Sequence, residues 1–586
     1  MTDHYGPKTP LANELLKMKY LLKGETFKEG MTRIADALKD GAEHFQKFRD
    51  ILLEQKFLPG GRVQSAMGAP REVTPYNCFV SVTIDDSMDS IMNAAKYAAE
   101  TMRLGGGIGY DFSNLRPKGD LIASLDSRSS GPISFMGIFD AICKTIASAG
   151  HRRGAQMGCL RVDHPDIEEF ITCKSDNLTL TQFNISVLVT DEFIQAVKTD
   201  SLFQLKFQGR VYKQVRARYL WDKIMRQTWD FAEPGVLFID RINRKNNLWY
   251  CETIAATNPC GEQPLPPHGA CLLGSINLTK YVVFKEDGTV RFDEDQLKAD
   301  IPHIVRAMDN VVDRAIYPLP EQEQSAKSKR RMGLGYTGLA NTGEALGFKY
   351  GSPEFLAWHE KIAELIRDEV YKASVNLAAE KGPFEEFDAD KFLQSEFAST
   401  LPKSIRKLIK TFGIRNSHLL SIAPTGTISN VADNVSSGIE PPFSHYYDRK
   451  VQTFEGEKTE RVMDYAYREW GIEGATALSI SAQDHVKVLC LASKYVDSAC
   501  SKTINIGDDV TWEEFKEVYM SAYEGGASGC TTFRAAGKRA GILTAAASEE
   551  VVDTPEEDVD TFVNEKDTDV GGACYYDPTT GIRSCE

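Results

Sequence analysis

The segment TNPCGEQPLP, residues 257–266, places an amide, a thiol and a carboxylate at alternate positions, Asn258, Cys260 and Glu262. Alternate positions of an extended segment share one face. The proline and the glycine on either side of the cysteine favour an extended backbone that can approach a ligand closely. The spacing indicates a site where the three groups converge on one substrate, and a turn that buries a cysteine explains it equally well.

The composition around this segment is that of a large globular protein. Its 586 residues exceed the size at which one hydrophobic core stops growing, so we expect roughly two to four domains or one very large barrel. The net charge of −15 argues against a protein that coats nucleic acid. The start is unlike a secretory signal and no apolar run approaches the ~20 residues that span a bilayer, which predicts a cytoplasmic protein without a membrane partner.

Three regions of the chain differ in pattern. Residues 1–55 predict a helical N-terminal region, because Thr9 and Pro10 resemble an N-cap and a first helical position and apolar residues follow at helical spacing. Residues 56–543 alternate short apolar runs, Gly-rich turns and longer helical segments, which is an α/β pattern. Residues 544–586 form an acidic tail whose composition predicts a flexible linker.

The tail ends in GGACYYDPTTGIRSCE, which carries Cys574 and Cys585. Before it, the stretch from Glu549 to Asp569 has ten Asp or Glu and one Lys. Exposed free cysteines are normally a liability, so the tail predicts a swinging redox dithiol, and incidental cysteines are the alternative. Ten residues separate the two thiols, and closing so short a loop costs little entropy.

The chain has twelve cysteines, too few for a disulfide scaffold of this length, and none forms a CxxC pair, which argues against a zinc ribbon. No metal site is predicted on this chain. We expect most of the cysteines outside the motifs to behave as small buried hydrophobes. These are Cys143, Cys159, Cys173, Cys251, Cys490, Cys500 and Cys530.

Two glycine-rich segments miss the known phosphate-binding patterns. LGGGIGYD, residues 104–111, lacks the GxGxxG spacing and predicts a tight backbone turn. GLANTGEAL has Glu344 where a P-loop has its lysine. APTGTIS, residues 423–429, offers hydroxyl donors and an open backbone, and suits either a phosphate site or a helix-capping turn.

Several segments, in order along the chain, resemble the signature segments of ribonucleotide reductase catalytic subunits. The similarity runs from about residue 56 to about residue 545 and resumes at the tail. The segments are YNCFVSVTIDDSMDSI at 76–91, GHRRGAQMG at 150–158, EPGVLFIDRINR at 233–244, NPCGE at 258–262, GACLLGSINLTKYV at 269–282, APTGTIS at 423–429 and SSGIEPPF at 436–443.

The resemblance implies a fold and a set of catalytic roles. The fold would be a ten-stranded α/β barrel of two five-stranded halves, with Cys260 on a central finger loop and a short helical region before it. Cys260 would carry a transient thiyl radical that abstracts the 3′-hydrogen of a ribonucleotide. Glu262 would accept the 3′-hydroxyl proton and Asn258 would hold the ribose hydroxyls. Cys78 and Cys271 would reduce the radical intermediate and end as a disulfide.

The resemblance also implies two nucleotide sites. The substrate phosphates would lie on the segment that contains Pro424, Thr425, Gly426, Thr427, Ile428 and Ser429. A specificity site for dNTP or ATP effectors would involve Asp86, Arg116, Arg152 and Arg153. From the residues alone, a salt-bridged surface pair would be the preferred interpretation of this last set.

The source of the first radical separates the members of this family. Subunits that receive it from a partner protein carry adjacent tyrosines in a strand before the tail, whereas this chain reads GCTTFR at 529–534, and Phe533 has no phenolic proton. The adjacent Tyr575 and Tyr576 lie in the tail and do not fit a relay. We therefore expect adenosylcobalamin as the radical source. The DxHxxG signature of some cobalamin proteins is absent, so no cobalamin ligand is named.

The sequence leaves two rival functions open. One is a large subunit without a cofactor of its own, which receives its radical from a separate metal-containing subunit. The other is a nucleotide-binding regulatory paralogue without catalysis, which the presence of Cys78, Cys260, Cys271 and Glu262 disfavours. The expected partners are a ribonucleotide substrate, a thioredoxin-like or glutaredoxin-like reductant and a second copy in a homodimer. Only about 55 residues precede FLPGGR, so no helical on/off nucleotide domain is expected.

Overall fold

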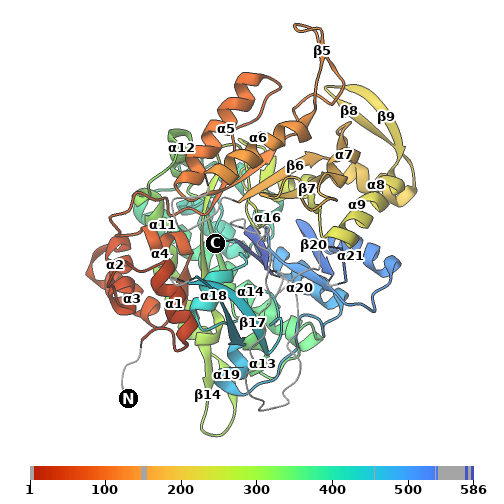
Figure 1. Ribbon diagram of the computed structural model, residues 1–586. Helices are drawn as coiled ribbons and strands as arrows, with labels where there is room; N and C mark the ends of the chain where they lie inside the picture. Colours follow the sequence, from red (N-terminus) through yellow and green to blue (C-terminus); the bar gives the residue numbers. More distant parts are fainter. Residues whose placement is uncertain are drawn as a thin grey trace.

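The computed structural model describes residues 5–146, 155–453, 456–534, 536–538, 574–577 and 582–585. It is an α/β protein in which helices surround one large mixed sheet (Figure 1). In the described part of the chain, no helix is both long enough and apolar enough to span a bilayer.

Three helices open the chain, as the sequence predicts: α1 Pro10–Lys19, α2 Phe27–Leu38 and α3 Gly41–Leu53. The Thr9 side chain accepts a hydrogen bond from the Ala12 amide, and Pro10 occupies the first turn. The apolar faces of α2 and α3 belong to the same buried cluster as the strands of the sheet. Helices α2 and α3 are therefore packed against the main core, whereas the buried residues of α1 belong to a second cluster.

Five neighbouring strands of the sheet run parallel: β2 Cys78–Val80, β3 Gly107–Asp111, β6 Gln156–Arg161, β7 Phe183–Val189 and β10 Gly235–Phe238. The apolar run at 184–190 thus forms a buried strand, as its pattern predicts. Beyond β10, strand β20 Gly529–Arg534 is antiparallel and is followed by β19 Thr503–Ile506, parallel to β20.

At the other end of these five strands, β13 Ala270–Asn277 is antiparallel to β2 and parallel to β16 Met332–Thr337. Strand β1 Phe57–Pro59 also pairs with β13. Two parallel bridges continue from β16, one between Leu334 and Leu420 and one between Ile422 and Cys500. Every residue of β13 and β16 is buried, which is typical of strands covered on both faces.

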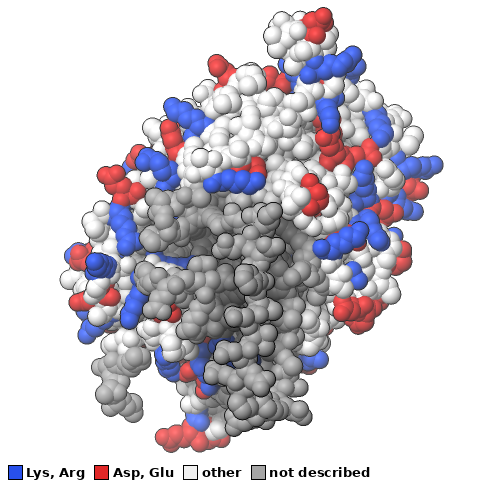
Figure 2. Space-filling view, in the orientation of Figure 1, with Lys and Arg blue, Asp and Glu red and all other residues white. Residues whose placement is uncertain are grey.

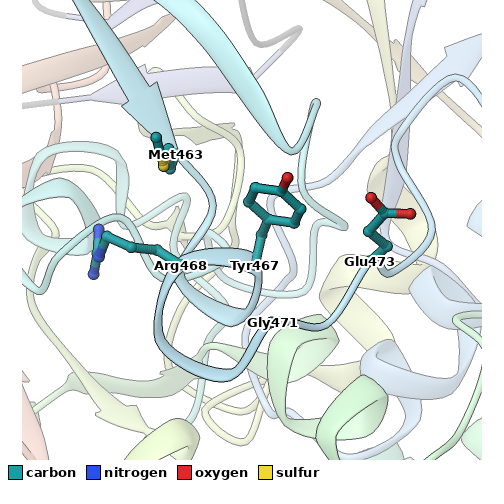
Figure 3. Close-up of a pocket in the computed structure, with 5 residues that line it drawn as sticks. All are labelled: Met463, Tyr467, Arg468, Gly471 and Glu473. Carbon is teal, nitrogen blue, oxygen red and sulfur yellow. The ribbon is translucent and has the colours of Figure 1, made fainter.

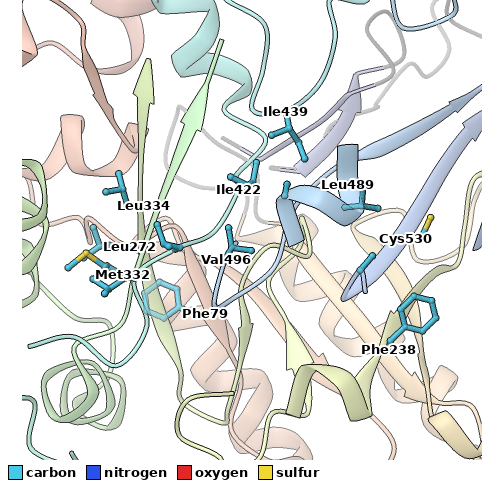
Figure 4. Close-up of a cluster of buried hydrophobic side chains, with 14 of the residues drawn as sticks. Phe79, Phe238, Leu272, Met332, Leu334, Ile422, Ile439, Leu489, Val496 and Cys530 are labelled. Carbon is cyan, nitrogen blue, oxygen red and sulfur yellow. The ribbon is translucent and has the colours of Figure 1, made fainter. Parts of the chain in front are cut away.

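The main hydrophobic core joins both ends of this path of strands (Figure 4). Its members include Phe79 of β2, Leu272 of β13, Leu334 of β16, Phe238 of β10 and Cys530 of β20. These residues come from positions 79 to 530, so the core forms only when distant segments have met. The long helix predicted at 353–380 is α14 Pro353–Lys381, which packs beside this core.

The further helices are α4 Gly61–Ala66, α5 Met88–Arg103, α6 Pro132–Thr145, α7 Ile167–Thr172, α8 Asp191–Thr199, α9 Ala217–Phe231, α10 Ile239–Lys245, α11 Glu294–Arg314, α12 Pro320–Lys329, α13 Leu339–Ala345, α15 Ala389–Phe392, α16 Glu396–Ser399, α17 Lys403–Phe412, α18 Gly426–Val431, α19 Tyr465–Trp470, α20 Ala482–Lys494 and α21 Trp512–Glu524, with a 3₁₀ turn at Leu278–Tyr281. Six two-stranded sheets complete the fold: β4 Leu121–Ile122 with β5 Ser127–Arg128, β8 Leu202–Phe207 with β9 Arg210–Arg216, β11 Ala256–Thr257 with β12 Pro264–Leu265, β14 Val282–Phe284 with β15 Val290–Phe292, β17 Tyr446–Thr453 with β18 Gly456–Met463, and β21 Cys574–Asp577 with β22 Ile582–Cys585.

The cysteines expected to be buried hydrophobes divide into three groups. Cys143, Cys159 and Cys530 are buried, whereas Cys173, Cys490 and Cys500 are half-buried. The prediction is wrong for Cys251, which is exposed. It lies in the turn that follows α10, where its thiol donates to the Leu248 carbonyl at 3.6 Å. A turn at the surface gives a small apolar side chain no core to enter.

Candidate active site

The segment 257–266 contains the loop between β11 and β12, and glycines of β3 make room for this loop. A Cβ on Gly109 would lie 1.8 Å from the Thr257 carbonyl oxygen, so only glycine allows this approach. The sequence prediction of a tight turn at 104–111 is therefore incomplete. The turn conformation occurs at Gly105, with φ of +96°, and residues from Gly107 onward form the strand β3.

Hydrogen bonds from distant segments hold the loop on two sides. The Asn184 side-chain amide donates to the Pro259 carbonyl at 3.1 Å, and the Ala499 backbone amide donates to the Glu262 carbonyl at 3.1 Å. Gln263 donates through its side chain to the Ser421 hydroxyl at 2.6 Å. The sequence analysis did not identify Asn184, Ser421 or Gln263 as positioning residues. Of these three residues, only Gln263 could have been identified from the sequence, because it follows Glu262 in the segment 257–266.

Three of the predicted catalytic side chains meet in the interior. The Asn258 amide lies 3.3 Å from the Cys78 sulfur, and that sulfur lies 3.8 Å from Glu262 Oε1. All three side chains are buried, and Cys260, on the same loop, is 5% exposed. The Gln263 backbone amide donates to Asn258 Oδ1 at 2.9 Å, which fixes the direction of the Asn258 amide group. The structure thus brings together residues 184 positions apart.

Glu262 has the environment of a proton acceptor and donor. Burial raises the pKa of its carboxyl to about 7, against a smaller lowering by Asn258. Its Oε2 is buried and has no hydrogen-bond partner among the described residues. A buried oxygen without a partner is costly unless a ligand satisfies it. A substrate hydroxyl would supply that hydrogen bond.

Cys78 and Cys271 are directly opposite each other on the antiparallel strands β2 and β13. Residues paired in this way have Cα atoms roughly 4.5 to 5.5 Å apart, within the range of about 4.4 to 6.8 Å that a disulfide requires. Both side chains are buried, and burial raises the pKa of the Cys271 thiol well above its usual value. The register therefore allows this pair to form a disulfide with little backbone movement.

The predicted phosphate segment begins beside Cys78, because Ala423 packs with Cys78 and Leu273 in one buried cluster. Helix α18 starts after Thr425, which has φ of +57°. The Thr425 and Ser429 hydroxyls lie 2.8 Å apart, and each lies 3.0 Å from the Thr337 hydroxyl. These two hydroxyls are thus already bonded within the protein, while the first backbone amides of α18 have no partner within the helix. The phosphate role stays a prediction.

The predicted effector residues are only partly described. Arg116 Nε lies 2.6 Å from Asp86 Oδ2, and the Arg116 backbone amide also donates to this carboxylate. Both side chains are partly exposed, which fits a surface ion pair as well as an effector site. Arg152 and Arg153 lie outside the described residues.

The tail cysteines have a defined backbone register. Cys574 of β21 is directly opposite Cys585 of β22 in an antiparallel pair. The register of the two strands therefore places the two backbone positions opposite each other. Their redox role stays a prediction.

A separate surface hollow lies around α19 (Figure 3). It is lined by Met463, Tyr467, Arg468, Gly471 and Glu473. None of these is a predicted site residue. Among the described residues, no group of three His, Cys, Asp or Glu side chains could hold a metal ion.

Comparison with known proteins matches the sequence to a family. A sequence model described as "Ribonucleotide reductase, barrel domain" matches residues 76–533. The chain is 34% identical to a "Vitamin B12-dependent ribonucleoside-diphosphate reductase" of Thermoplasma acidophilum, over 99% of this chain and 78% of that protein. The chain belongs to the ribonucleotide reductase family. The matched range contains Cys78, Cys260, Glu262 and Cys271, and it ends before the tail.

Two further relatives of this reductase differ in how much of the chain they match. A protein of Mycobacterium tuberculosis with the same name as the Thermoplasma relative is 33% identical over 92% of this chain and 75% of its own length. A "Ribonucleoside-diphosphate reductase large subunit" of Monkeypox virus is 29% identical over 64% of this chain and 53% of its own length. The two relatives named as B12-dependent thus match more of the chain.

Proposed function

We propose that this protein converts ribonucleotides to 2′-deoxyribonucleotides through a thiyl radical at Cys260, with adenosylcobalamin as the source of the radical. The observation that carries the proposal is the buried group formed by Asn258, Glu262 and Cys78, with Cys271 opposite Cys78. Such a group offers a hydrogen-bonding amide, a proton acceptor and two electrons from a thiol pair. These are the components that removal of a hydroxyl as water requires.

Each side chain has a distinct role in this proposal. Asn258 holds the ribose hydroxyls, and Glu262 takes the proton of the 3′-hydroxyl at its Oε2. The 2′-hydroxyl leaves as water, and the thiols of Cys78 and Cys271 are oxidised to a disulfide. Exclusion of solvent from the interior protects the radical at Cys260, whose side chain is 5% exposed. The substrate phosphates lie at the start of α18.

The choice of adenosylcobalamin is supported by Phe533 and by the names of the two longer-matching relatives. Phe533 is 4% exposed on β20, at the place where a relay would need a tyrosine. When bound, adenosylcobalamin supplies an organic radical that oxidises a thiol. The residue that fits this role is Cys260, which is disulfide-bonded in the structure and would be the thiol to be oxidised once that bond is reduced. We assign no residue to hold the cobalamin itself.

The proposed architecture is the barrel of two five-stranded halves, within residues 56–543. The two parallel bridges support it, because they connect β16 through residues 420–422 to the segment that becomes β19. The antiparallel pairs of β10 with β20 and of β2 with β13 would then join the two halves. The loop with Cys260 would enter this barrel as its finger.

The remaining sites complete the proposal. Cys574 and Cys585 re-reduce the pair Cys78 and Cys271 and are themselves reduced by a thioredoxin-like or glutaredoxin-like protein. Effector dNTPs or ATP bind near Asp86 and Arg116, with Arg152 and Arg153 as further contacts, in a homodimer.

The deciding experiment is a turnover assay of the purified chain with ribonucleoside di- and triphosphates, a dithiol reductant, and adenosylcobalamin either present or absent. We expect product only with the cofactor, and none from Cys260→Ser. Cys251→Ser, at an exposed turn, is the matched control and should remain active. Activity that needs an added metal-containing subunit would refute the cofactor assignment, and turnover by Cys260→Ser would refute the radical assignment.

A further inference from the structure

One surface of this acidic protein is strongly basic. Residues 202–226 contain seven lysines or arginines and one aspartate, whereas the whole chain has a net charge of −15. They form the hairpin of β8 and β9 and most of α9. Figure 2 shows Lys and Arg side chains, with Asp and Glu side chains among them, on the side of the molecule where Figure 1 places β8 and β9. We call β8, β9 and the start of α9 the basic ribbon.

The strand pattern turns several of these charges toward solvent. On β8, Phe203, Leu205 and Phe207 are buried, so the alternate positions face outward. Lys206 occupies one of these outward positions, and Arg210 and Arg216 are exposed on β9. Neither strand contains an acidic residue.

Three cations of the basic ribbon differ from its other cations, because Lys213 and Lys223 pair with Glu168 and Arg226 pairs with Asp230. Within the described part of the chain, Lys206, Arg210 and Arg218 form no ion pair. Arg210 stacks on the Tyr212 ring at 4.7 Å, and Arg218 donates to the Lys198 carbonyl at 3.3 Å. By contrast, Arg216 lies 3.8 Å from Asp200. The uncompensated charges give this surface a local attraction for an anionic segment.

The chain contains such a segment close by in sequence. From Glu549 to Asp569 there are ten acidic residues and one lysine. The described chain before it ends at Lys538, whose amide donates to the Asp230 carbonyl at 2.7 Å and whose ammonium lies 3.1 Å from the Asp230 carboxylate. Asp230 is in the last turn of α9, so the last residue described before the acidic segment lies at one end of the helix whose other end follows β9.

The distances allow the two segments to meet. Helix α9 has 15 residues and is about 22 Å long at ~1.5 Å per residue. The chain from Lys538 to Glu549 can extend about 35 Å at ~3.3 Å per residue. The acidic segment can therefore begin beside the basic ribbon and follow it.

We propose that the acidic segment 549–569 docks on the basic ribbon. The contact is electrostatic between exposed groups, so it weakens as salt shortens the screening length to about 3 Å at ~1 M. Docking keeps the segment that joins the body to Cys574 and Cys585 at a fixed side of the molecule. It thereby sets how far the tail dithiol can move.

Helix α17 is a second basic surface and provides the comparison. It carries Lys403, Arg406, Lys407 and Lys410. Lys410 is already paired with Asp390 at 3.0 Å, and α17 packs on α14 and α15. No described stretch of the chain ends at α17, whereas Lys538 contacts the last turn of α9.

The test uses the full chain and a zero-length carbodiimide, which joins lysine amines to carboxylates, with the linked peptides identified by mass spectrometry. At low salt we expect links from residues 549–569 to Lys206, Lys213 or Lys223, and their loss at ~1 M salt. The triple variant R210E/R216E/R218E retains these lysines and should reduce the links at least tenfold. The control variant R406E/K407E/K410E on α17 should leave them unchanged.

Several outcomes would overturn the proposal. They are links that persist in the R210E/R216E/R218E variant, links that go instead to the α17 lysines, or an absence of links at low salt in the unaltered chain. Nucleic-acid binding that this variant abolishes, without any links from the acidic segment, would assign the ribbon to another ligand. The salt series uses the unaltered chain, so its result does not depend on whether a variant folds. The cross-links are measured without substrate or cofactor. A failure of the proposed reductase function would therefore leave this test intact.

Discussion

Glu262 combines a buried position with an oxygen that no described residue satisfies. A carboxyl in water would be ionised well below neutrality, and it is burial that brings the pKa of Glu262 to about 7. A group with this pKa can accept and return a proton at physiological pH with little cost in either direction. The position therefore suits a residue that must do both within one turnover.

Turnover should depend on the ionisation of Glu262. The proposed step needs the carboxylate, so we expect the rate to fall as the pH drops below about 7, where the carboxyl is protonated. Glu262→Gln should lower kcat by roughly 10²- to 10⁴-fold and remove this limb of the profile. The measurement is kcat as a function of pH on both sides of neutrality. An unchanged profile in Glu262→Gln would contradict the assigned role.

Glu344 on α13 is a second buried carboxyl, at 8% exposure, and it serves no proposed catalytic step. Burial, with a smaller contribution from the charge of Asp464, raises its pKa to about 8. The folded state then binds the proton more tightly than the unfolded state does. This contribution to stability is complete below the unfolded-state pKa and is lost as the pH rises toward about 8.

Replacing Glu344 by Gln should therefore stabilise the protein at alkaline pH. The native chain loses about 1.4 kcal/mol for each pH unit between the two pKa values, and the variant does not. We expect the unfolding midpoint of Glu344→Gln to exceed that of the native chain at pH 8, and the difference to shrink in mild acid. Glu354→Gln, at an exposed position of α14, is the control and should show neither effect. Equal unfolding midpoints of the two proteins at pH 8 would show that burial of Glu344 does not lower the stability of the native chain at that pH.

At the scale of elements, two glycines of β3, Gly107 and Gly109, leave the space that the hairpin of β11 and β12 occupies. A Cβ on Gly109 would meet the Thr257 carbonyl oxygen at 1.8 Å, and on Gly107 it would lie 3.2 Å from the Pro259 ring. The strand and the hairpin thus approach more closely than any larger residue at Gly109 allows. The position of Cys260 depends on this contact.

Gly109→Ala should displace the hairpin while the rest of the sheet remains folded. Because a shift of about 1 Å in a catalytic group can cost ~100-fold in rate, we expect a loss of that order in kcat. Gly137→Ala on α6 is the matched control, since its added Cβ would meet no atom within 4 Å. Circular dichroism should be unchanged in both variants, and full activity of Gly109→Ala would exclude this positioning role.

At the scale of the whole molecule, a buried ion pair joins two segments that are 62 residues apart in the chain. Lys502 Nζ lies 2.6 Å from Glu440 Oε2, and both side chains are almost fully buried. The His485 ring lies 3.0 Å from the same ammonium, and burial lowers the pKa of His485 well below its usual value. The ion pair fixes the segment 436–443 next to β19. Gly438 of that segment donates to the Thr425 hydroxyl at 2.8 Å, beside the proposed phosphate site.

Lys502→Met should destabilise the protein by roughly 3 to 5 kcal/mol, because it leaves the Glu440 carboxylate buried without its partner. The double variant K502M/E440Q should recover part of that loss, since the uncompensated charge is removed. Lys494→Met is the control, because its pair with Glu360 is exposed and should contribute at most about 1 kcal/mol. Midpoints of urea unfolding measure all three. A loss in Lys502→Met no larger than in the control would contradict the account.

The sequence by itself determined the local chemistry of this protein. Asn258, Cys260 and Glu262 lie within five residues, so covalent spacing alone predicts that they can act together. The N-terminal helices, the buried strand at 184–190 and the long helix at 353–380 also followed from local caps and periodicity. The ordered family segments extended this local information to the fold and to the family.

Only the tertiary structure decided which distant residues meet and what burial does to them. Cys78 and Cys271 are opposite each other because β2 and β13 pair, and nothing local in either segment specifies that register. The pKa of Glu262, the need for glycine at Gly109 and the exposure of Cys251 likewise depend on packing. Desolvation and close contact are properties of the assembled core, which forms from segments hundreds of residues apart.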